Sequence, residues 1–258
     1  MFNLNLGLLD YLTNGKIITE EWQYWTLYLS FVIIGIAAAY LLGSINTAIV
    51  VSKVFYREDI RKFGSGNAGL TNMLRTYGKG AAGLTLLGDM LKTAIAIFIT
   101  GFLLGFHYYH GLSIDDGYCY MAGLFAVLGH VFPIYYGFRG GKGVLVTATM
   151  ALILTPVVFL CLLIIFIVVV ALSKYVSLGS VTAAILYPVL TNAYIKIFLL
   201  GRPSGILILS TIILAIFIVW CHRENLQRIS DRTERKISFK KKEKEPASAE
   251  NTDSSDDE

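Results

Sequence analysis

The sequence predicts an all-α, polytopic membrane protein with seven transmembrane helices, an N-terminus outside and a C-terminus in the cytoplasm. Hydrophobic residues make up 55% of the 258-residue chain, which is more than a soluble domain of this length usually contains. The apolar runs are mostly long enough to cross a bilayer, which takes about 20 residues, and they lack the alternation of a membrane β-barrel. Lys and Arg are concentrated in a few of the connections between these runs. The runs cover residues 27–51, 81–106, 118–138, 144–172, 178–200 and 204–221.

The distribution of positive charge predicts which connections face the cytoplasm. Residues 107–117, for example, contain two aspartates and no Lys or Arg. Cytoplasmic loops of membrane proteins carry the excess of Lys and Arg, so the cation-rich segments are expected on the cytoplasmic side. These segments are residues 53–80, 139–143, 173–178 and the region after Cys221.

This orientation requires the run 144–172 to cross the membrane twice. The run is long for one helix, and Thr155-Pro156 offers a place for a turn. Its two halves, of about 11 and 16 residues, are short for full spans. Counting both halves gives the seven crossings.

The membrane domain, residues 26–235, is flanked by two segments of different character. Residues 1–25 lack the basic stretch and apolar core of a signal peptide, and aromatic residues such as Trp22 predict an external, interfacial segment. Residues 236–258 begin basic and end acidic, which predicts a disordered, charged cytoplasmic tail. Its basic part is expected to contact anionic membrane lipid. The three cysteines fit neither a zinc site nor a disulfide framework.

The central motif is GSGNAGLTNMLR, residues 64–75. Its beginning matches a dinucleotide-binding fingerprint, but that fingerprint requires a βαβ unit, so NAD and FAD binding are excluded. Glycines still allow close backbone approach, and N–H groups that open a helix bind anions. A flexible turn is the alternative, and the similarity to a later glycine loop favours the anion site. The candidate residues are Gly64, Ser65, Gly66, Asn67, Asn72 and Arg75.

Two apolar runs contain ionisable residues. Asp89 and Lys92 are three residues apart and therefore share a helical face. Charges at this depth are costly, so we expect a structural ion pair, with substrate contact as the alternative. His130 is expected to be a hydrogen-bonded core residue.

A second glycine loop follows the run 118–138 and contains Gly140, Gly141, Lys142 and Gly143. It is not a Walker A loop, because Val144 replaces the Ser or Thr that would bind magnesium. Glycines around a lysine, with a helix after them, still suit phosphate binding. Lys142 would supply the positive charge.

Polar residues beside the last two runs complete the candidate site. Ser180 is a candidate anion donor, and Ser177 is expected to cap a helix N-terminus. His222, Asn225 and Arg228 share one face if the last helix continues. Because all these motifs fall on the cytoplasmic side, they predict a site for one or two phosphates that also opens onto lipid.

The motifs together resemble those of a known family, over roughly residues 41–237. The bacterial acyl-phosphate-dependent glycerol-3-phosphate acyltransferases, the PlsY family, carry similar motifs in the same order. The resemblance implies seven transmembrane helices in the bacterial inner membrane, with the active site facing the cytoplasm. It also implies transfer of a fatty acyl group from acyl phosphate to the 1-hydroxyl of glycerol 3-phosphate, giving lysophosphatidic acid in the first step of phospholipid synthesis. The motifs that carry it are GSGNAGLTNMLRTYGKGAAG, GHVFPIYYGFRGGKGV, KYVSLGS and HRENLQRISDRTE.

The resemblance implies roles for individual residues, and it implies no metal, no cofactor and no nucleic-acid partner. One departure lies near the site, because Arg232 stands where the family commonly has Gly before Thr-Glu. Five residues are expected to be catalytic: Ser65, Arg75, Lys142, His222 and Asn225. The expected substrate-binding residues are Gly64, Gly66, Asn67, Asn72, Gly140, Gly141, Gly143, Ser180 and Glu234.

The implied chemistry is direct acyl transfer, in which positioning and charge neutralisation supply most of the catalysis. The general base is either His222 or a phosphate oxygen of the substrate. An acyl-enzyme on Ser65 is disfavoured, because no His or Asp lies at a triad-like spacing beside it. The alternatives outside this family are a transporter of phosphorylated solutes and a seven-helix receptor. The absence of internal repeats disfavours the first, and the glycine loops are unexplained by the second.

Overall fold

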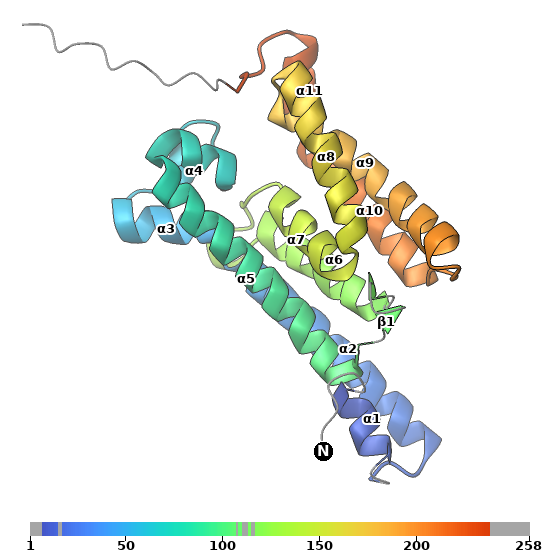
Figure 1. Cartoon of the computed structure of the whole chain (residues 1–258). Helices are drawn as coiled ribbons and strands as arrows, with labels where there is room; N and C mark the ends of the chain where they lie inside the picture. The colour runs from blue at the N-terminus through green and yellow to red at the C-terminus, as the bar shows by residue number, and fades with distance from the viewer. Residues whose placement is uncertain (1–6, 15–16, 107, 110–112, 115–116, 238–258) are drawn as a thin grey trace, which may run out of the picture.

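Helices make up nearly all of the computed structural model, which describes residues 7–14, 17–106, 108–109, 113–114 and 117–237 (Figure 1). The all-α prediction is confirmed, with one small exception. Tyr108–Tyr109 (β1) and Ser113–Ile114 (β2) pair as a short antiparallel hairpin.

Five helical segments in the described part of the chain are long and apolar enough to cross a membrane, and a bent pair of helices adds a sixth. The bent pair is α10 (Gly205–Cys221) with α11 (Arg223–Ser230), which meet at 53°. The other segments are α2 (Glu21–Ser44) with α3 (Thr47–Tyr56), α5 (Lys79–Leu104), α6 (Gly117–Val131) with η2 (Ile134–Tyr136), α8 (Pro156–Ser173), and α9 (Val176–Ala193) with the π-helix η3 (Tyr194–Phe198).

The run 144–172 forms two helices, α7 (Val144–Leu154) and α8, so the predicted turn at Thr155-Pro156 is confirmed. Pro156 is the first residue of α8, where its missing N–H costs no helical hydrogen bond. Lys142, just before α7, and Ser177, just after α8, are joined by hydrogen bonds through Asn225 and Glu234. The two helices therefore form a hairpin, although α7, with 11 residues, is short for a span.

The first apolar run, 27–51, is interrupted, so the expectation of one continuous helix is wrong there. The side chain of Asn46 accepts a hydrogen bond from Ile49 N (3.1 Å) and caps α3, while its amide donates to Ala68 O (3.2 Å). Gly43 allows close helix packing. A Cβ atom there would lie 2.3 Å from Ala126 O, so only glycine lets α2 approach α6 this closely.

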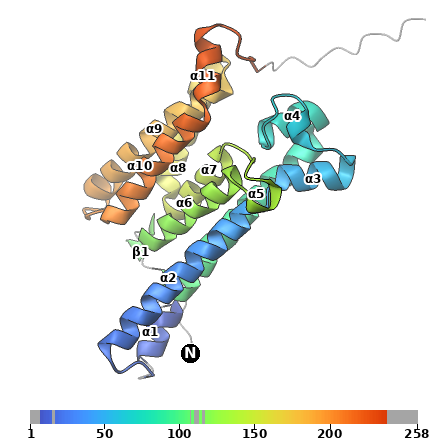
Figure 2. The same cartoon turned by 180° about the vertical axis from the view of Figure 1, so that it is seen from behind.

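The spanning helices form two groups with α6 and α7 between them. In both views α2 and α5 run side by side, and α8, α9 and α10 form the second group (Figures 1 and 2). α6 contacts α2 and α10, whereas α7 contacts α5 and α8. At one end of the bundle lies α1 (Gly7–Asn14). At the other end lie α4 (Leu70–Tyr77), the 3₁₀ turn η1 (Ile60–Lys62) and α11.

The two flanking segments differ in how much of them the structure describes. In the N-terminal segment, Leu9 is buried in a small cluster with Ile18 and Leu104. In the C-terminal tail only Lys236 and Ile237 are described, and Ile237 N donates to Lys174 O (2.9 Å). The prediction for the rest of the tail, 238–258, lies outside the described residues.

Candidate functional site

The predicted polar motifs line one cavity of about 730 Å³ at the end of the bundle that carries α4 and α11. Gly64 and Gly140 are outside the lining, each next in sequence to a residue that lines the cavity. The lining includes Ser65, Gly66, Asn67, Asn72, Arg75, Gly141, Lys142, Gly143, Ser180, His222, Asn225 and Glu234.

Asn72 organises the first glycine loop. Its Oδ1 accepts a hydrogen bond from Ser65 N (3.0 Å), and its Nδ2 lies within 3.0 to 3.3 Å of the carbonyls of Ile60, Phe63 and Asn67. Gly64 has φ +61°, and a Cβ atom there would lie 2.1 Å from Asn72 Oδ1. Asn72 is therefore committed to shaping the loop, and glycine is required beside it.

Other parts of this loop place polar side chains in the cavity wall. The N–H groups of Gly66 and Gly69 donate to Phe63 O and Asn67 O, so they are used within the loop. Ser65 and Arg75 have exposed side chains and line the cavity. The loop thus presents a hydroxyl, a guanidinium and the first turn of α4, all of which suit an anion.

The second glycine loop packs tightly on the end of α6. Gly140 N donates to Val131 O (3.0 Å), and Gly141 N donates to His130 O (3.1 Å). A Cβ atom on Gly140 would lie 2.0 Å from His130 O, and one on Gly141 would lie 2.0 Å from His130 Nε2. The N–H groups of Gly140 and Gly141 are therefore used in packing, and Lys142 and the start of α7 are the candidate anion-binding groups of this loop in the cavity wall.

A chain of hydrogen bonds connects Lys142 to the C-terminal segment. Lys142 Nζ donates to Asn225 Oδ1, and Asn225 Nδ2 donates to Glu234 Oε1 (2.7 Å). Glu234 also accepts from Ser177 Oγ (2.9 Å) and from Arg228 Nε (2.9 Å). Three donors from α9 and α11 thus converge on one carboxylate.

The charges of this network affect two pKa values. Burial opposes ionisation of Glu234, but the hydrogen bonds from Asn225, Arg228 and Ser177 outweigh it and lower the pKa of the carboxyl group. Burial also lowers the pKa of Lys142, and the positive charge of Arg228 adds to this effect. An anion bound beside Lys142 would favour its charged form.

The corner between α10 and α11 places His222 in the cavity wall. The ring is buried, and its Nδ1 lies 2.8 Å from Ile218 O. A carbonyl can only accept, so Nδ1 carries the proton and Nε2 of the neutral ring is an acceptor. The helix does not continue straight, because α11 turns away from α10 at this residue.

Of the two serines of α9, Ser177 differs from the prediction. Ser177 lies inside α9, whose N-cap is Tyr175, so the N-cap assignment was wrong. Ser177 is used instead as a donor to Glu234. Ser180 lines the cavity, but its hydroxyl donates to Val176 O (3.0 Å) within the helix.

The predicted ion pair of Asp89 and Lys92 is confirmed and includes His130. Lys92 Nζ lies 2.8 Å from Asp89 Oδ1 and 3.0 Å from His130 Nδ1. It also donates to Gly43 O (3.0 Å) and Ile45 O (2.9 Å), where α2 ends. The buried charges therefore fasten α2, α5 and α6 together below the second glycine loop, and Asp89 and His130 reach the cavity wall.

The cavity continues from its polar end into an apolar trough. Side chains of α7, α8 and α9 form this part, with Leu152, Phe159, Leu162, Phe166 and Ala184 in the wall. An anion-binding end joined to an apolar trough suits an amphiphile with a phosphate group. Sequence reasoning missed Ser177, and also Asp59 and Arg61, whose contacts are described below.

Comparisons with known proteins show which family the chain matches. Residues 33–232 match the family described as Glycerol-3-phosphate acyltransferase. The glycerol-3-phosphate acyltransferase of Listeria monocytogenes serovar 1/2a (strain ATCC BAA-679 / EGD-e) is 37% identical over 201 residues, 78% of this chain and 94% of the relative. That of Clostridioides difficile (strain 630) is 40% identical over 213 residues, 82% of this chain and 98% of the relative.

Two solved structures are also similar to the chain. Both are crystal structures of PlsY (YgiH), an integral membrane glycerol 3-phosphate acyltransferase. The glycerol 3-phosphate form is 32% identical with a TM-score of 0.68, and covers 80% of this chain and 96% of that chain. The lysophosphatidic acid form is 31% identical with a TM-score of 0.66, and covers 80% and 95%.

Proposed function

Because the chain belongs to the glycerol-3-phosphate acyltransferase family and to its PlsY type, we propose that it uses a fatty acyl phosphate as donor. It transfers the acyl group to the 1-hydroxyl of glycerol 3-phosphate and releases lysophosphatidic acid and phosphate. The similar PlsY structures with glycerol 3-phosphate and with lysophosphatidic acid support the acceptor and the product.

The observation that carries this proposal is a cavity that combines a cationic end with an apolar trough. Both substrates contain a phosphate, and only the donor contains a fatty acyl chain. A trough between α7, α8 and α9 accommodates that chain, while Arg75 and Lys142 offset the repulsion between the two phosphates. The acyl carbonyl then lies at the junction, where the acceptor hydroxyl reaches it.

In the proposed step, the oxygen of the 1-hydroxyl forms a bond to the acyl carbonyl carbon. The bond from this carbon to the phosphate oxygen breaks, and phosphate leaves with the electron pair. The hydroxyl proton passes to Nε2 of His222 or to an oxygen of the leaving phosphate. Nδ1–H donates a hydrogen bond to Ile218 O, which leaves Nε2 without a proton and supports His222 as the proton acceptor.

The contacts suggest different roles for the other residues. Ser65 and Arg75 bind a phosphate, and Lys142 neutralises charge as phosphate leaves. Both ends of the Asn225 amide are occupied, so Asn225 acts by orienting Lys142. Glu234 in turn holds Asn225.

The proposed topology has seven crossings in the bacterial cell membrane, with α7 as a short crossing paired with α8. The N-terminus is outside, and the site and C-terminus face the cytoplasm, in agreement with the positions of the cations. A cysteine introduced by Ser255→Cys, in a variant whose native Cys119, Cys161 and Cys221 are replaced by serine, tests the orientation. Labelling by an impermeant maleimide only after cell lysis supports a cytoplasmic C-terminus, and labelling of intact cells contradicts it.

The donor is tested with purified protein in lipid, labelled glycerol 3-phosphate and either palmitoyl phosphate or palmitoyl-CoA. We expect labelled lysophosphatidic acid from palmitoyl phosphate alone. Product from palmitoyl-CoA alone would overturn the proposed donor. No product from either donor would overturn the proposed reaction.

A further inference from the structure

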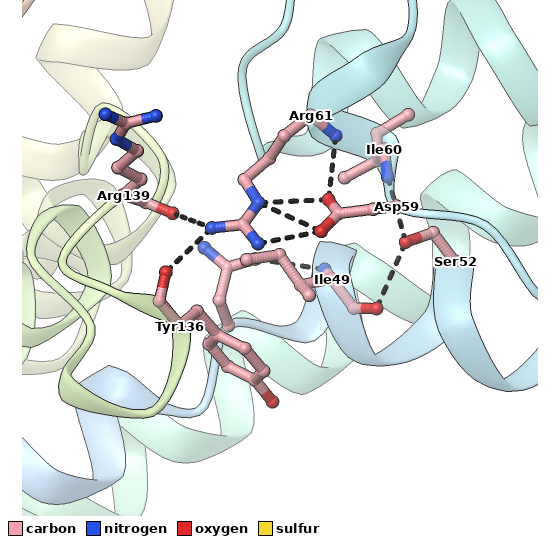
Figure 3. A network of polar contacts seen from close by, with 8 residues as sticks. Ile49, Ser52, Asp59, Ile60, Arg61, Tyr136 and Arg139 are labelled. Carbon is pink, nitrogen blue, oxygen red and sulfur yellow. Dashed lines mark hydrogen bonds and ion pairs between the residues drawn. The ribbon is translucent and has the colours of Figure 1, made fainter.

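Arg61 joins the two glycine loops, although it lies outside the residues that line the cavity (Figure 3). Its Nη1 donates to Tyr136 O (2.7 Å) and to Arg139 O (3.0 Å). Both carbonyls belong to the segment that leads into Gly140. A side chain from η1 therefore determines where the main chain of the second loop lies.

The guanidinium of Arg61 is itself held by Asp59. Nε lies 3.0 Å from Asp59 Oδ1, and Nη2 lies 2.7 Å from Asp59 Oδ2, so the two groups form a bidentate pair. This pairing keeps the pKa of Asp59 below its usual range. The side chains of Arg61 and Asp59 are 24% and 18% exposed, so the pair is shielded from much of the solvent. Asp59 thus orients one edge of the guanidinium, and the other edge contacts the second loop.

The 3₁₀ turn that carries Arg61 is held by hydrogen bonds to α3 and to the first glycine loop. Ser52 Oγ accepts a hydrogen bond from Ile60 N (3.2 Å) and donates to Ile49 O (3.0 Å), which anchors η1 to α3 (Figure 3). Ile60 O accepts from Asn72, the residue that also holds Ser65 N. A continuous path of hydrogen bonds thus runs from Ser65 through η1 and Arg61 to the second loop.

We propose that Arg61 is a positioning residue that sets the distance between the loop of Ser65 and the loop of Lys142. The proposal rests on the proposed function, in which both loops bind the phosphates of one reaction. Guanidinium is suited to this role because its planar fork donates to a carboxylate and to two carbonyls at once. An ammonium group has the same charge, but it does not reproduce this fork.

The test compares Arg61→Met and Arg61→Lys with Lys62→Met in the full-length protein in lipid. Lys62 is an exposed cation on the same turn, so its removal changes the local charge equally and leaves the bridge intact. We expect the Kd and KM for glycerol 3-phosphate to rise roughly tenfold in Arg61→Met, with kcat changed much less, because the loops separate without loss of any group in the cavity. Arg61→Lys should show most of this defect, and Lys62→Met should match the wild type.

Asp59→Asn provides a second route to the same result. It should raise the Kd for glycerol 3-phosphate less than Arg61→Met does, and the double variant should be no worse than Arg61→Met alone, because Asp59 acts through Arg61. If Arg61→Met fails to fold, Arg61→Lys and Asp59→Asn decide the question.

Several outcomes would overturn the proposal. One is a wild-type Kd for glycerol 3-phosphate in Arg61→Met or Arg61→Lys. Another is an equal rise in Kd in Lys62→Met, which would mean that the charge of this turn, and not the bridge made by Arg61, affects binding. The Kd of glycerol 3-phosphate is measured without an acyl donor. A wrong assignment of the donor therefore appears only in the wild-type activity assay, and a wrong assignment of Arg61 appears only in the variants.

Discussion

At the scale of single residues, the site depends on how the partners of Lys142 are held. Lys142 contacts Asn225, Asn225 contacts Glu234, and Glu234 receives two further donors. Each group has its position determined by the next, so the ammonium group is oriented before substrate binds. Such preorganisation favours stabilisation of developing charge on a leaving phosphate.

The first prediction concerns Glu234. Glu234→Gln removes the charge that fixes Asn225 and Arg228, and we expect kcat/KM to fall roughly tenfold, in line with the value of hydrogen bonds to charged groups. Steady-state kinetics with palmitoyl phosphate measures the change. Glu224→Gln is the matched control, because the side chain of Glu224 is 73% exposed and lies 3.8 Å from the same arginine. An equal loss in both variants would contradict the assigned role of Glu234.

The second prediction concerns Arg75, whose exposed side chain lines the cavity. Arg75→Ala should lower kcat/KM roughly 100-fold or more, as loss of a charge-stabilising donor does in other enzymes. The thermal unfolding midpoint should be unchanged. Lys79→Ala removes an exposed cation nearby and should stay active. A fully active Arg75→Ala enzyme would mean that Arg75 does not bind phosphate.

Sequence patterns pointed to residues that line the cavity because glycine loops and cations are the groups that commonly bind phosphate. Arg61 was missed because Asp59 and Arg61 are two residues apart in a 3₁₀ turn, which produces no helical-face pattern. Its other partners, the carbonyls of Tyr136 and Arg139, are 75 and 78 residues away in sequence. Backbone acceptors at such separations have no signal in the amino-acid types.

At the scale of elements, the C-terminal end of α11 determines the position of Glu234. The helix ends at Ser230, and Arg232 follows with φ +57°, the left-handed conformation in which glycine is favoured. The N–H groups of Thr233 and Glu234 both donate to Arg228 O. The backbone therefore makes the sharp turn that brings Glu234 back to Asn225, even though Arg232 stands where the family commonly has Gly.

The third prediction follows from this turn. Arg232→Gly should relieve the left-handed strain and raise the free energy of unfolding by up to about 1 kcal/mol, with activity retained. Thermal unfolding of the detergent-solubilised protein measures the effect. Arg235→Gly, three residues on and without a positive φ, should be neutral or destabilising. A loss of stability in Arg232→Gly would show that the arginine side chain matters more than the strain.

Sequence signals predicted some elements well and others poorly. The turn at Thr155-Pro156 was predictable because proline ends helical hydrogen bonding locally. The break between α2 and α3 was not, because Asn46 is stabilised by Ala68 O, 22 residues later. Ser177 was misassigned for the same reason, since its partner Glu234 is 57 residues away.

At the scale of the whole molecule, the cavity lies between two groups of helices and combines two chemical environments. The glycine loops and α11 supply its polar end, and α7, α8 and α9 supply its apolar wall. Leu152 lies eight residues after the start of α7, about 12 Å along the helix. The far part of the trough is therefore suited to the distal methylenes of a long acyl chain.

The fourth prediction concerns acyl-chain length. Leu152→Trp should narrow the trough and lower kcat/KM for palmitoyl phosphate roughly tenfold, with a smaller effect on octanoyl phosphate, because each buried CH₂ contributes about 0.8 kcal/mol. Leu160→Trp is the control, because Leu160 is 55% exposed on α8 and outside the cavity wall. Equal loss with both chain lengths would mean that the chain lies elsewhere.

The shortness of α7 has a consequence for the surrounding bilayer. Eleven residues rise about 16 Å, whereas the hydrocarbon core is about 30 Å thick. If the far end of α7 is level with one boundary of that core, Lys142 at its other end lies well below the opposite membrane surface. Water and headgroups would then extend into a local depression of the leaflet on that side. In the proposed reaction, a soluble phosphate ester and a membrane-dissolved acyl chain would meet there without either substrate leaving its own phase.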